Sequence, residues 1–342
     1  MEILRDFTMW SFLPFIIAFA VTALAGPVFI PWLRKLKFGQ EIREEGPKWH
    51  QKKSGTPTMG GIMFIVGIGI AVIVSTVSAA VKGNLNADTA KGILIFGVSL
   101  LFGIVGFIDD YIKVVKKRNL GLTAAQKFAL QLLFAIVYVI GLYCIGGINL
   151  GMKIPFVDHV VYVPMWIYIP FVLFVVVGVV NAVNLTDGLD GLATSVTFVV
   201  GLFFAVLSFV KYTALGDTVF AAALVGGMLG FFIFNRHPAK VFMGDTGSLF
   251  LGAAVALMGI DLGIPVFLII IGFVYFCETL SVIIQTTYFK YTKKKYGEGR
   301  RIFKMTPIHH HFEMCGWNEW QIVGVFTLVT AILCAVTFAW LM

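Results

Sequence analysis

The fold is decided by apolar runs that end in short polar loops, and residues 164–191 show this pattern: PMWIYIPFVLFVVVGVVNAVNLTDGLDG. No Lys, Arg, Asp or Glu occurs between residues 164 and 183. A transmembrane helix needs about 20 predominantly apolar residues, so this run is long enough to cross a bilayer. The loop that follows is rich in asparagine, aspartate and glycine, which makes it a candidate functional segment at the membrane surface.

Runs of the same kind fill nearly the whole chain, which is 59% hydrophobic and 13% charged. Soluble domains contain about 25% charged residues, so the composition excludes an ordinary soluble protein. We expect an all-α integral membrane protein forming one polytopic domain over residues 1–342. Its first apolar run is expected to be a retained span and not a removed signal peptide. The ten expected transmembrane helices are approximately residues 12–33, 60–81, 92–112, 126–146, 164–183, 190–211, 218–235, 247–262, 263–289 and 319–341.

Lysine and arginine are distributed unequally between the two sides of this expected bundle. With the N-terminus outside, the loops on the inner side contain 21 of the 26 Lys and Arg residues. Cytoplasmic loops are enriched in these residues, so both chain ends are expected outside, and residues 147–163 are expected to form a small periplasmic hairpin. The excess of basic residues is then explained by the orientation of the chain in the membrane. We expect no nucleic-acid partner, because no soluble basic domain is present to bind one. The inner loops are residues 34–59, 109–127, 184–190, 236–246 and 290–318.

Four polar clusters interrupt the apolar pattern, and all of them fall in the inner loops. Ionisable residues are costly within a membrane, so such clusters are functional candidates. Because they come from distant parts of the chain, we expect them to meet in one cytoplasmic-face active site. Each cluster also has a plainer interpretation, as a solvated helix end, a tight turn, an N-cap or a structural loop. The clusters are Asp109 and Asp110 in GFIDDYIK; Asn181, Asn184, Asp187 and Asp190 in NAVNLTDGLDG; Asp245 in HPAKVFMGDTGS; and His309, His310 and His311 in TPIHHHFE.

The adjacent aspartates Asp109 and Asp110 are expected to have different roles. Neighbouring residues on an α-helix point about 100° apart, so the two carboxylates cannot meet the same phosphate. One is expected to act as a base at the reaction centre. The other is expected to hold a basic partner such as Lys127, or to support the metal ion from behind its direct ligands. Asp109 is the candidate base because it lies one residue deeper in its span. Lys53 and Lys127 are the functional candidates among the lysines because each lies where a motif loop meets a span.

Asp245 is the candidate metal ligand. It lies between Gly244 and Gly247, which leave room for a hydrated cation. Mg²⁺ prefers oxygen ligands and typically combines one or two carboxylates with substrate phosphates. The three consecutive histidines do not predict a zinc site, because consecutive side chains on a helix cannot converge on one ion. Hydrogen bonding to phosphate, or the ordering of a lid, is their expected role.

Carboxylates, amides, lysines and imidazoles at a membrane face are typical of Mg²⁺-dependent phosphate chemistry. A metal ion and lysines would neutralise the charge that develops on a diphosphate leaving group. Apolar grooves between the spans would seat a lipid acceptor. From the residues alone, the expected reaction is a phosphoryl or phosphoglycosyl transfer at the membrane interface.

Five motifs together resemble the bacterial phospho-N-acetylmuramoyl-pentapeptide transferase family, or translocase I, within the polyprenyl-phosphate N-acetylhexosamine-1-phosphate transferase superfamily. The motifs are GTPTMGG, GFIDDYIK, NAVNLTDGLDGLA, PAKVFMGDTGS and TPIHHHFEMCGW, and they occur in this order between residues 53 and 317. The resemblance implies that UDP-N-acetylmuramoyl-pentapeptide and undecaprenyl phosphate react to give lipid I and UMP, with Mg²⁺. This reaction is the first membrane step of peptidoglycan synthesis, which supports cell-wall biogenesis and cell division, and it takes place at the bacterial cytoplasmic membrane.

The resemblance also implies which residues form the site. The catalytic candidates are Asp109, Asp110, Asp245, His309, His310 and His311, with Asp245 as the metal-binding aspartate. Together with Lys127 and Asn181, the substrate-binding candidates are Lys53, Thr58, Asn184, Asp187, Gly188, Leu189, Asp190, Asn235, Phe242 and Gln285. The choice between direct attack and a covalent aspartyl intermediate stays open, as does the oligomeric state, for which a homodimer is one candidate.

Two other functions are alternatives. A sister enzyme that uses UDP-N-acetylglucosamine would share the acidic motifs, although the TPIHHHFE stretch favours the muramoyl branch. A membrane transporter would place its ionisable residues near the bilayer midplane on broken, repeated helices. Here the acidic residues lie at the ends of spans and no inverted repeat is detected, so the transporter is the weaker alternative.

Overall fold

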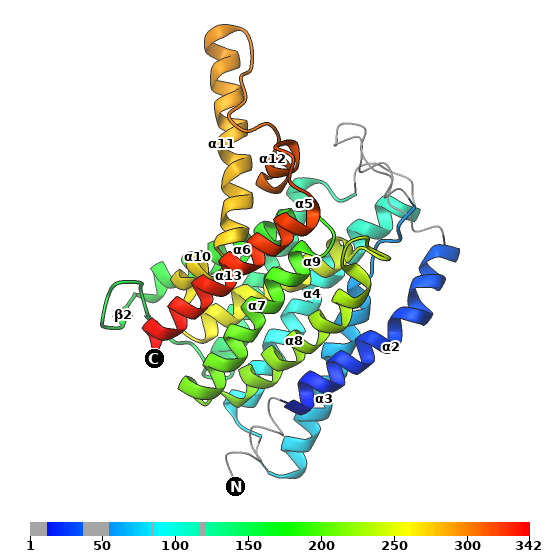
Figure 1. The fold of residues 1–342 in the computed structure, drawn as a ribbon. Coiled ribbons are helices and arrows are strands. Elements are labelled where there is room, and N and C mark those ends of the chain that lie inside the picture. The colour runs from blue at the N-terminus through cyan, green and yellow to red at the C-terminus, as the bar shows by residue number, and fades with distance from the viewer. Residues whose placement is uncertain (1–11, 37–54, 84, 116–120) are drawn as a thin grey trace.

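The computed structural model describes residues 12–36, 55–83, 85–115 and 121–342, and these form a bundle of long helices (Figure 1). Lys53, one of the candidate residues, lies outside the described ranges. The helices are α2 (Leu13–Lys35), α3 (Gly61–Val81), α4 (Ala87–Val115), α5 (Ala124–Cys144), α6 (Met165–Thr186), α7 (Leu192–Leu207), α8 (Leu215–Asn235), α9 (Gly244–Asp261), α10 (Leu268–Ile271), α11 (Phe273–Tyr296), α12 (Ile308–Met314) and α13 (Glu319–Leu341). Two short helical segments, η3 (Ser208–Tyr212) and η4 (Pro265–Phe267), follow α7 and precede α10.

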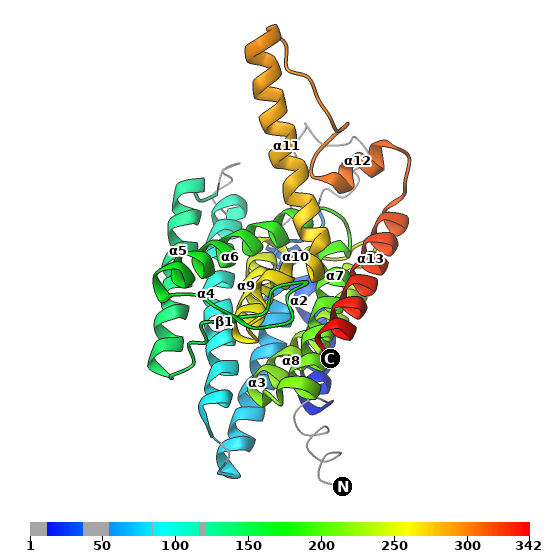
Figure 2. The same ribbon diagram turned by 90° about the vertical axis from the view of Figure 1, so that its left-hand side faces the viewer.

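The expected all-α membrane architecture is confirmed. Within the described residues, eight helices are long and apolar enough to cross a membrane, and a ninth span results if the bent pair of α10 and α11 counts as one. The remaining expected span corresponds to α9, which has 18 residues and ends in Asp261. Between Pro265–Ile271 and Phe273–Tyr296 the chain bends by 84°, so residues 263–289 do not form one straight helix. Beyond the bend, α11 extends past the rest of the bundle (Figure 2).

The central element of the bundle is α9. Every residue from Thr246 to Asp261 is buried, because α3, α4, α6 and α7 surround this helix. Small residues permit the close packing, as is usual between membrane helices. A Cβ atom at Gly106 of α4 would collide with the backbone of Asp245, and a Cβ atom at Gly61 of α3 would collide with Gly247. The first turn of α9 is therefore held directly against the ends of two neighbouring helices.

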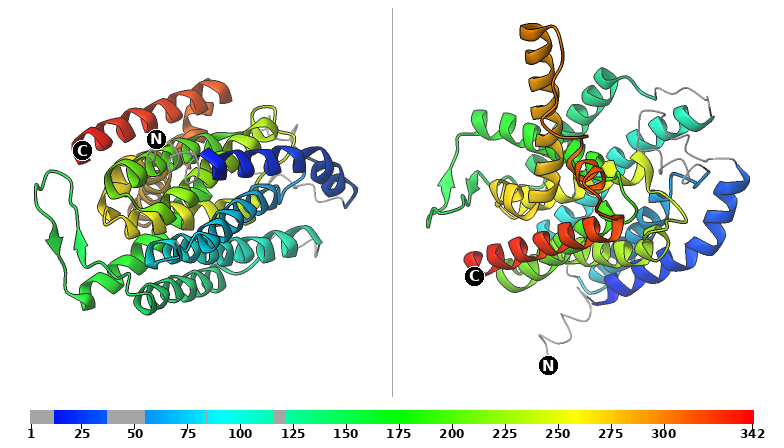
Figure 3. Two further views of the ribbon diagram at one scale, coloured as in Figure 1. Left: turned by 90° about the horizontal axis from the view of Figure 1, so that it is seen from below. Right: turned by 45° about the horizontal axis from the view of Figure 1, so that its top comes forward.

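The hairpin expected within residues 147–163 is confirmed. Strands β1 (Gly151–Met152) and β2 (Val161–Tyr162) pair antiparallel, with Gly151 opposite Tyr162 and Met152 opposite Val161. The hairpin joins α5 to α6 and projects from the edge of the bundle (Figure 3). It lies at the far end of α5 from Lys127, and therefore away from the polar motifs.

Candidate active site

Four charged side chains from three helices form a carboxylate–lysine cluster, which we define as Asp109, Lys113, Lys127 and Asp245. The Lys113 Nζ atom lies 2.6 Å from Asp109 Oδ2 and 2.9 Å from Asp245 Oδ2. The Lys127 Nζ atom lies 2.9 Å and 2.7 Å from the same two oxygens. Each lysine therefore bridges both carboxylates. The Asp109 side chain is fully buried, whereas those of Lys113 and Lys127 are 37% and 23% exposed, so the cluster is open to one side.

The local sequence of α4 and α5 explains how the charged groups of the cluster are positioned. Lys113 follows Asp109 by four residues on α4, which puts the two side chains on the same face of the helix. Lys127 lies in the first turn of α5, where Thr123 and Gln126 form a capping box: the Gln126 N–H donates to Thr123 Oγ1, and the Thr123 N–H donates to Gln126 Oε1. The backbone N–H of Leu122, just before this cap, donates to Asp109 Oδ1 at 2.7 Å. The start of α5 and the end of α4 are thus joined at the cluster.

Asp110 has a different set of partners. Its carboxylate accepts hydrogen bonds from the backbone N–H groups of Asp245 at 3.1 Å and Thr246 at 2.9 Å, and from Thr246 Oγ1 at 2.7 Å. Asp110 therefore caps the N-terminus of α9. The plainer interpretation of the sequence had instead made Asp245 the N-cap. The helix begins at Gly244, whose φ of 72° favours glycine and whose added Cβ atom would collide with Asp110 and Thr58. Asp110 acts on the cluster by fixing the position of Asp245.

The two aspartates do diverge, and their partners differ in part from those expected. The sequence argument made Asp109 the candidate base and gave Asp110 either a lysine such as Lys127 or a place beside the metal's ligand. In the structure, Asp109 holds both lysines, whereas Asp110 contacts the first turn of α9, which contains the candidate metal ligand Asp245. The 100° separation along α4 predicts the divergence, whereas the identity of each partner depends on how α5 and α9 pack.

The last turns of α6 and the loop after it approach the cluster from another side. Asn184 Nδ2 donates to Asp245 Oδ1 at 2.9 Å and to Ser248 Oγ at 2.8 Å. Asn181 instead donates to Gln131 Oε1 at 2.7 Å, so the two asparagines do not share a partner. Burial, followed by the negative charges of Asp245, Asp110 and Asp190, raises the pKa of Asp187 to about 8. With this pKa the Asp187 carboxyl is mostly protonated at neutral pH, so it adds little negative charge to the site.

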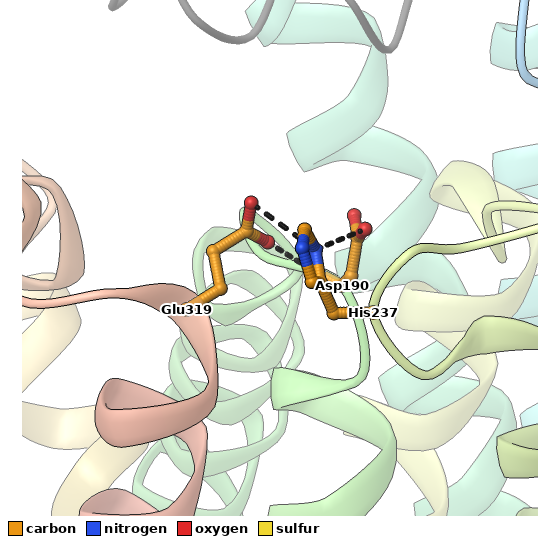
Figure 4. A group of neighbouring side chains, drawn as sticks. All are labelled: Asp190, His237 and Glu319. Atoms are coloured by element: carbon orange, nitrogen blue, oxygen red, sulfur yellow. Dashed lines mark hydrogen bonds and ion pairs between the residues drawn. The ribbon is translucent and has the colours of Figure 1, made fainter.

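Asp190, His237 and Glu319 form a second group, in which a histidine lies between two carboxylates (Figure 4). His237 Nδ1 lies 3.0 Å from Asp190 Oδ2 and 3.4 Å from Glu319 Oε1. Asp190 also accepts from the Ala239 N–H at 2.9 Å, and its own N–H donates to Glu319 Oε2 at 3.2 Å. The group ties together the loop after α6, the loop between α8 and α9, and the start of α13. Because both carboxylates of this group accept hydrogen bonds from N–H donors, we interpret the group as a structural junction between these three segments.

Replacement of His237 by alanine is expected to destabilise the protein. Asp190 is 3% exposed, and it would lose its imidazole partner. Such a loss costs about 1–3 kcal/mol. The measurement is thermal unfolding in detergent, with the exposed residue Asp158 changed to asparagine as the control. Equal melting temperatures for wild type and His237→Ala would contradict the junction.

The three histidines diverge, in agreement with the argument against a zinc site. His309 is buried, and its Nδ1 atom lies 3.0 Å from Glu278 Oε2. His310 Nδ1 lies 2.6 Å from Glu313 Oε2. His311 Nδ1 accepts from the Lys304 N–H at 3.1 Å. His309 faces the loop after α6, because a Cβ atom at Gly188 would collide with its Nε2 atom.

Other substrate-binding candidates are occupied by contacts within the protein. The Asn235 side chain accepts from Thr194 Oγ1 and donates to the Val241 carbonyl. Gln285 Oε1 accepts from the N–H groups of residues 302 and 303, and its Nε2 donates to the Phe303 carbonyl. The backbone of Phe242 pairs with Pro57 and Gly60, which fixes the GTPTMGG segment and the buried Thr58 beside α9. Leu189 is buried in the core.

Four residues of these groups were absent from the sequence-based candidates: Lys113, His237, Glu278 and Glu319. Lys113 had a usable signal, since it follows Asp109 by four residues on a helix. Glu278 had a stronger one, because it is an ionisable residue within the apolar run 263–289. His237 and Glu319 had none, because each lies in a loop or helix end where polar residues are ordinary.

Comparison with known proteins places these groups in context. The family model described as glycosyl transferase family 4 matches residues 92–263, which extend from α4 through α9. A phospho-N-acetylmuramoyl-pentapeptide-transferase signature matches residues 53–65. A phospho-N-acetylmuramoyl-pentapeptide-transferase of Clostridium botulinum (strain Eklund 17B / Type B) is 46% identical over 323 residues, covering 94% of each chain. Relatives of the same name from Shouchella clausii and Listeria monocytogenes serotype 4b are each 47% identical, covering 92% of both chains for the first and 91% of this chain and 92% of the relative for the second.

Proposed function

The chain belongs to the family of phospho-N-acetylmuramoyl-pentapeptide transferases, and we propose that its carboxylate–lysine cluster is the centre at which the phosphate group is transferred. One observation supports this position above the others: Lys113 and Lys127 each join Asp109 to Asp245. Two ammonium groups on the partly exposed side of such a cluster can turn to an incoming diphosphate. The resulting neutralisation of charge is the main contribution that a protein makes to this type of reaction.

We propose that the donor is UDP-N-acetylmuramoyl-pentapeptide and that the acceptor is undecaprenyl phosphate. An oxygen of the lipid phosphate bonds to the phosphorus attached to the sugar, and the bond from that phosphorus to the UMP oxygen breaks. Asp109 keeps Lys113 and Lys127 in place while this charge moves. Asn184 and the cap from Asp110 hold Asp245 in its orientation.

The donor atoms at the cluster fit Mg²⁺. Asp109, Asp110 and Asp245 each offer a carboxylate oxygen, and these oxygens lie within 4.8 Å of one another. Asp110 is occupied by the N-terminus of α9, and Asp109 is fully buried, so Asp245 is the residue that we propose binds the ion. Both lysines now bind Asp245 Oδ2, so the ammonium groups would have to turn toward the substrate phosphates when the ion binds. When bound, Mg²⁺ would neutralise charge on the leaving phosphate.

The test of the function is release of UMP by the purified protein in the presence of undecaprenyl phosphate. We expect release from UDP-N-acetylmuramoyl-pentapeptide that depends on Mg²⁺, and little release from UDP-N-acetylglucosamine. Preferential use of UDP-N-acetylglucosamine would instead identify the sister enzyme. Full activity in the presence of a chelator would contradict the metal assignment.

We further propose that the cluster lies at the cytoplasmic face. The motif loops approach one end of the bundle, and this is the end to which the lysine and arginine count assigns the cytoplasm. Reporter fusions after Lys304 should therefore read cytoplasmic, and a fusion after Met342 should read periplasmic. A cytoplasmic C-terminus would contradict this orientation, because α13 crosses the bundle once after Lys304.

A further inference from the structure

Glu278 is a buried carboxylate in a membrane helix. It lies on α11, six residues after the bend, and is 0% exposed. Burial of an ionised carboxylate is costly unless a partner compensates its charge. Within the described residues, Glu278 Oε2 forms an ion pair with His309, whereas Glu278 Oε1 has no hydrogen-bond partner. A carboxylate kept at such a cost, with a histidine as its counter-charge, points to a role for that histidine.

The contact fixes which nitrogen of His309 bears a proton. Glu278 Oε2 lies 3.0 Å from His309 Nδ1 and 3.4 Å from the backbone N–H of the same residue. A carboxylate oxygen can only accept here, so Nδ1 must be the donor. This arrangement is the one by which carboxylates orient histidines at functional sites. The opposite nitrogen, Nε2, is then the free one, and it is buried without a partner.

The free nitrogen faces the motif loop of the site. A Cβ atom at Gly188 would collide with His309 Nε2, so the imidazole lies directly against the backbone between Asp187 and Leu189. The same loop follows Asn184, which donates to Asp245. His309 therefore connects Glu278 in the membrane helix to the loop beside the carboxylate–lysine cluster. The absence of a side chain at Gly188 is what permits this approach.

We propose that Glu278 is a positioning residue for the transfer reaction: it holds His309 as an imidazolium whose Nε2–H donates to a phosphate oxygen of the sugar-nucleotide diphosphate. This inference rests on the proposed function. The Glu278 carboxylate supplies the negative charge that stabilises the imidazolium in a buried position. Without it, the ring would lose both its orientation and its charge, and Nε2 would become an acceptor that repels phosphate oxygens.

The Glu278→Gln variant removes the negative charge of Glu278 and keeps the orientation of His309. Two N–H donors of His309 point at one Glu278 oxygen, so the amide oxygen of glutamine would take that position and leave Nδ1 protonated. We expect turnover to fall about 10- to 100-fold, the range for residues that orient a functional histidine, with little change in melting temperature. Glu298→Gln, an exposed position beyond the end of α11, is the matched control and should retain full activity.

A double-mutant cycle tests whether Glu278 acts through His309. If it does, Glu278→Gln should cause no further loss in a His309→Gln background. Multiplicative losses would overturn the proposal, because they would mean that Glu278 serves the fold and not the histidine. The cycle is read from turnover and from KM for the nucleotide, measured separately.

A spectroscopic measurement keeps the inference distinct from the proposed function. In protein labelled with ¹⁵N-histidine, the signal that disappears in His309→Gln belongs to His309. We expect this signal to report two protonated ring nitrogens in the wild type and a loss of that state in Glu278→Leu. An unprotonated Nδ1 or Nε2 in the wild type would overturn the proposal whatever reaction the protein catalyses.

Discussion

Replacement of Asp245 by asparagine is expected to reduce the rate of transfer by about 10²-fold or more, with the fold intact. Asparagine has the same size, and its oxygen can still accept from Asn184. It cannot compensate the charges of Lys113 and Lys127, which lie 2.9 Å and 2.7 Å from Asp245 Oδ2. It also lacks the anionic oxygen that a magnesium ion requires. The measurement is UMP release at saturating substrate over a range of Mg²⁺ concentrations.

Asp158→Asn is the matched control, because Asp158 is exposed in the hairpin region between α5 and α6. It should have wild-type activity and stability. The assignment of Asp245 fails if its asparagine variant retains near-normal turnover at ordinary Mg²⁺ concentrations. A lowered melting temperature with normal turnover per folded molecule would likewise show that Asp245 serves the packing of α9 and not the reaction.

Most of the membrane architecture could be predicted because length and hydropathy determine it. A run such as residues 164–183 has too few polar groups to be anything but a buried or membrane-spanning helix. The 84° bend before α11 could not be predicted in this way. Hydropathy is continuous across residues 263–289, and a bend depends on backbone geometry that hydropathy does not contain. The small residues of α9 likewise indicate close packing without identifying α4 and α3 as the neighbours.

The composition of the site was predicted better than its internal contacts. Asp109, Asp245, Asn184 and Lys127 were all expected at one site, and they lie within one connected set of contacts. Lys113 was not, because Lys116 and Lys117 stand near it in the sequence and all three resemble positive-inside anchors.

Asn235 and Gln285 illustrate the opposite difficulty. Both were expected to line the nucleotide site, and both hydrogen-bond to backbone groups of their own surroundings. A polar residue near a motif can bind the substrate, or it can hold the surrounding loop in place. Sequence spacing does not distinguish these roles, because the competing partners are backbone groups, which every segment of the chain offers.

The final prediction separates the adjacent aspartates by two measurements. Asp109→Asn should reduce turnover by about 10²-fold or more, because Lys113 and Lys127 would lose the buried carboxylate that holds them. Its effect on stability should be smaller than that of Asp110→Asn, because the new amide would face lysine side chains that can turn away into water. The asparagine oxygen can still accept from the Leu122 N–H, and both lysines are partly exposed, so water can solvate them.

Asp110→Asn should lower both activity and melting temperature. Both oxygens of Asp110 accept from donors of Asp245 and Thr246, so an amide N–H in place of either oxygen would face another donor. An unsatisfied buried donor costs about 1–3 kcal/mol, and here the cost falls on the first turn of α9. Because Asp245 lies in that turn, the loss of order reaches the cluster indirectly. Thermal unfolding and UMP release, measured on both variants, test the distinction. Equal losses of melting temperature for Asp109→Asn and Asp110→Asn would show that the two carboxylates serve the packing alike, and would contradict the separate roles that their partners indicate.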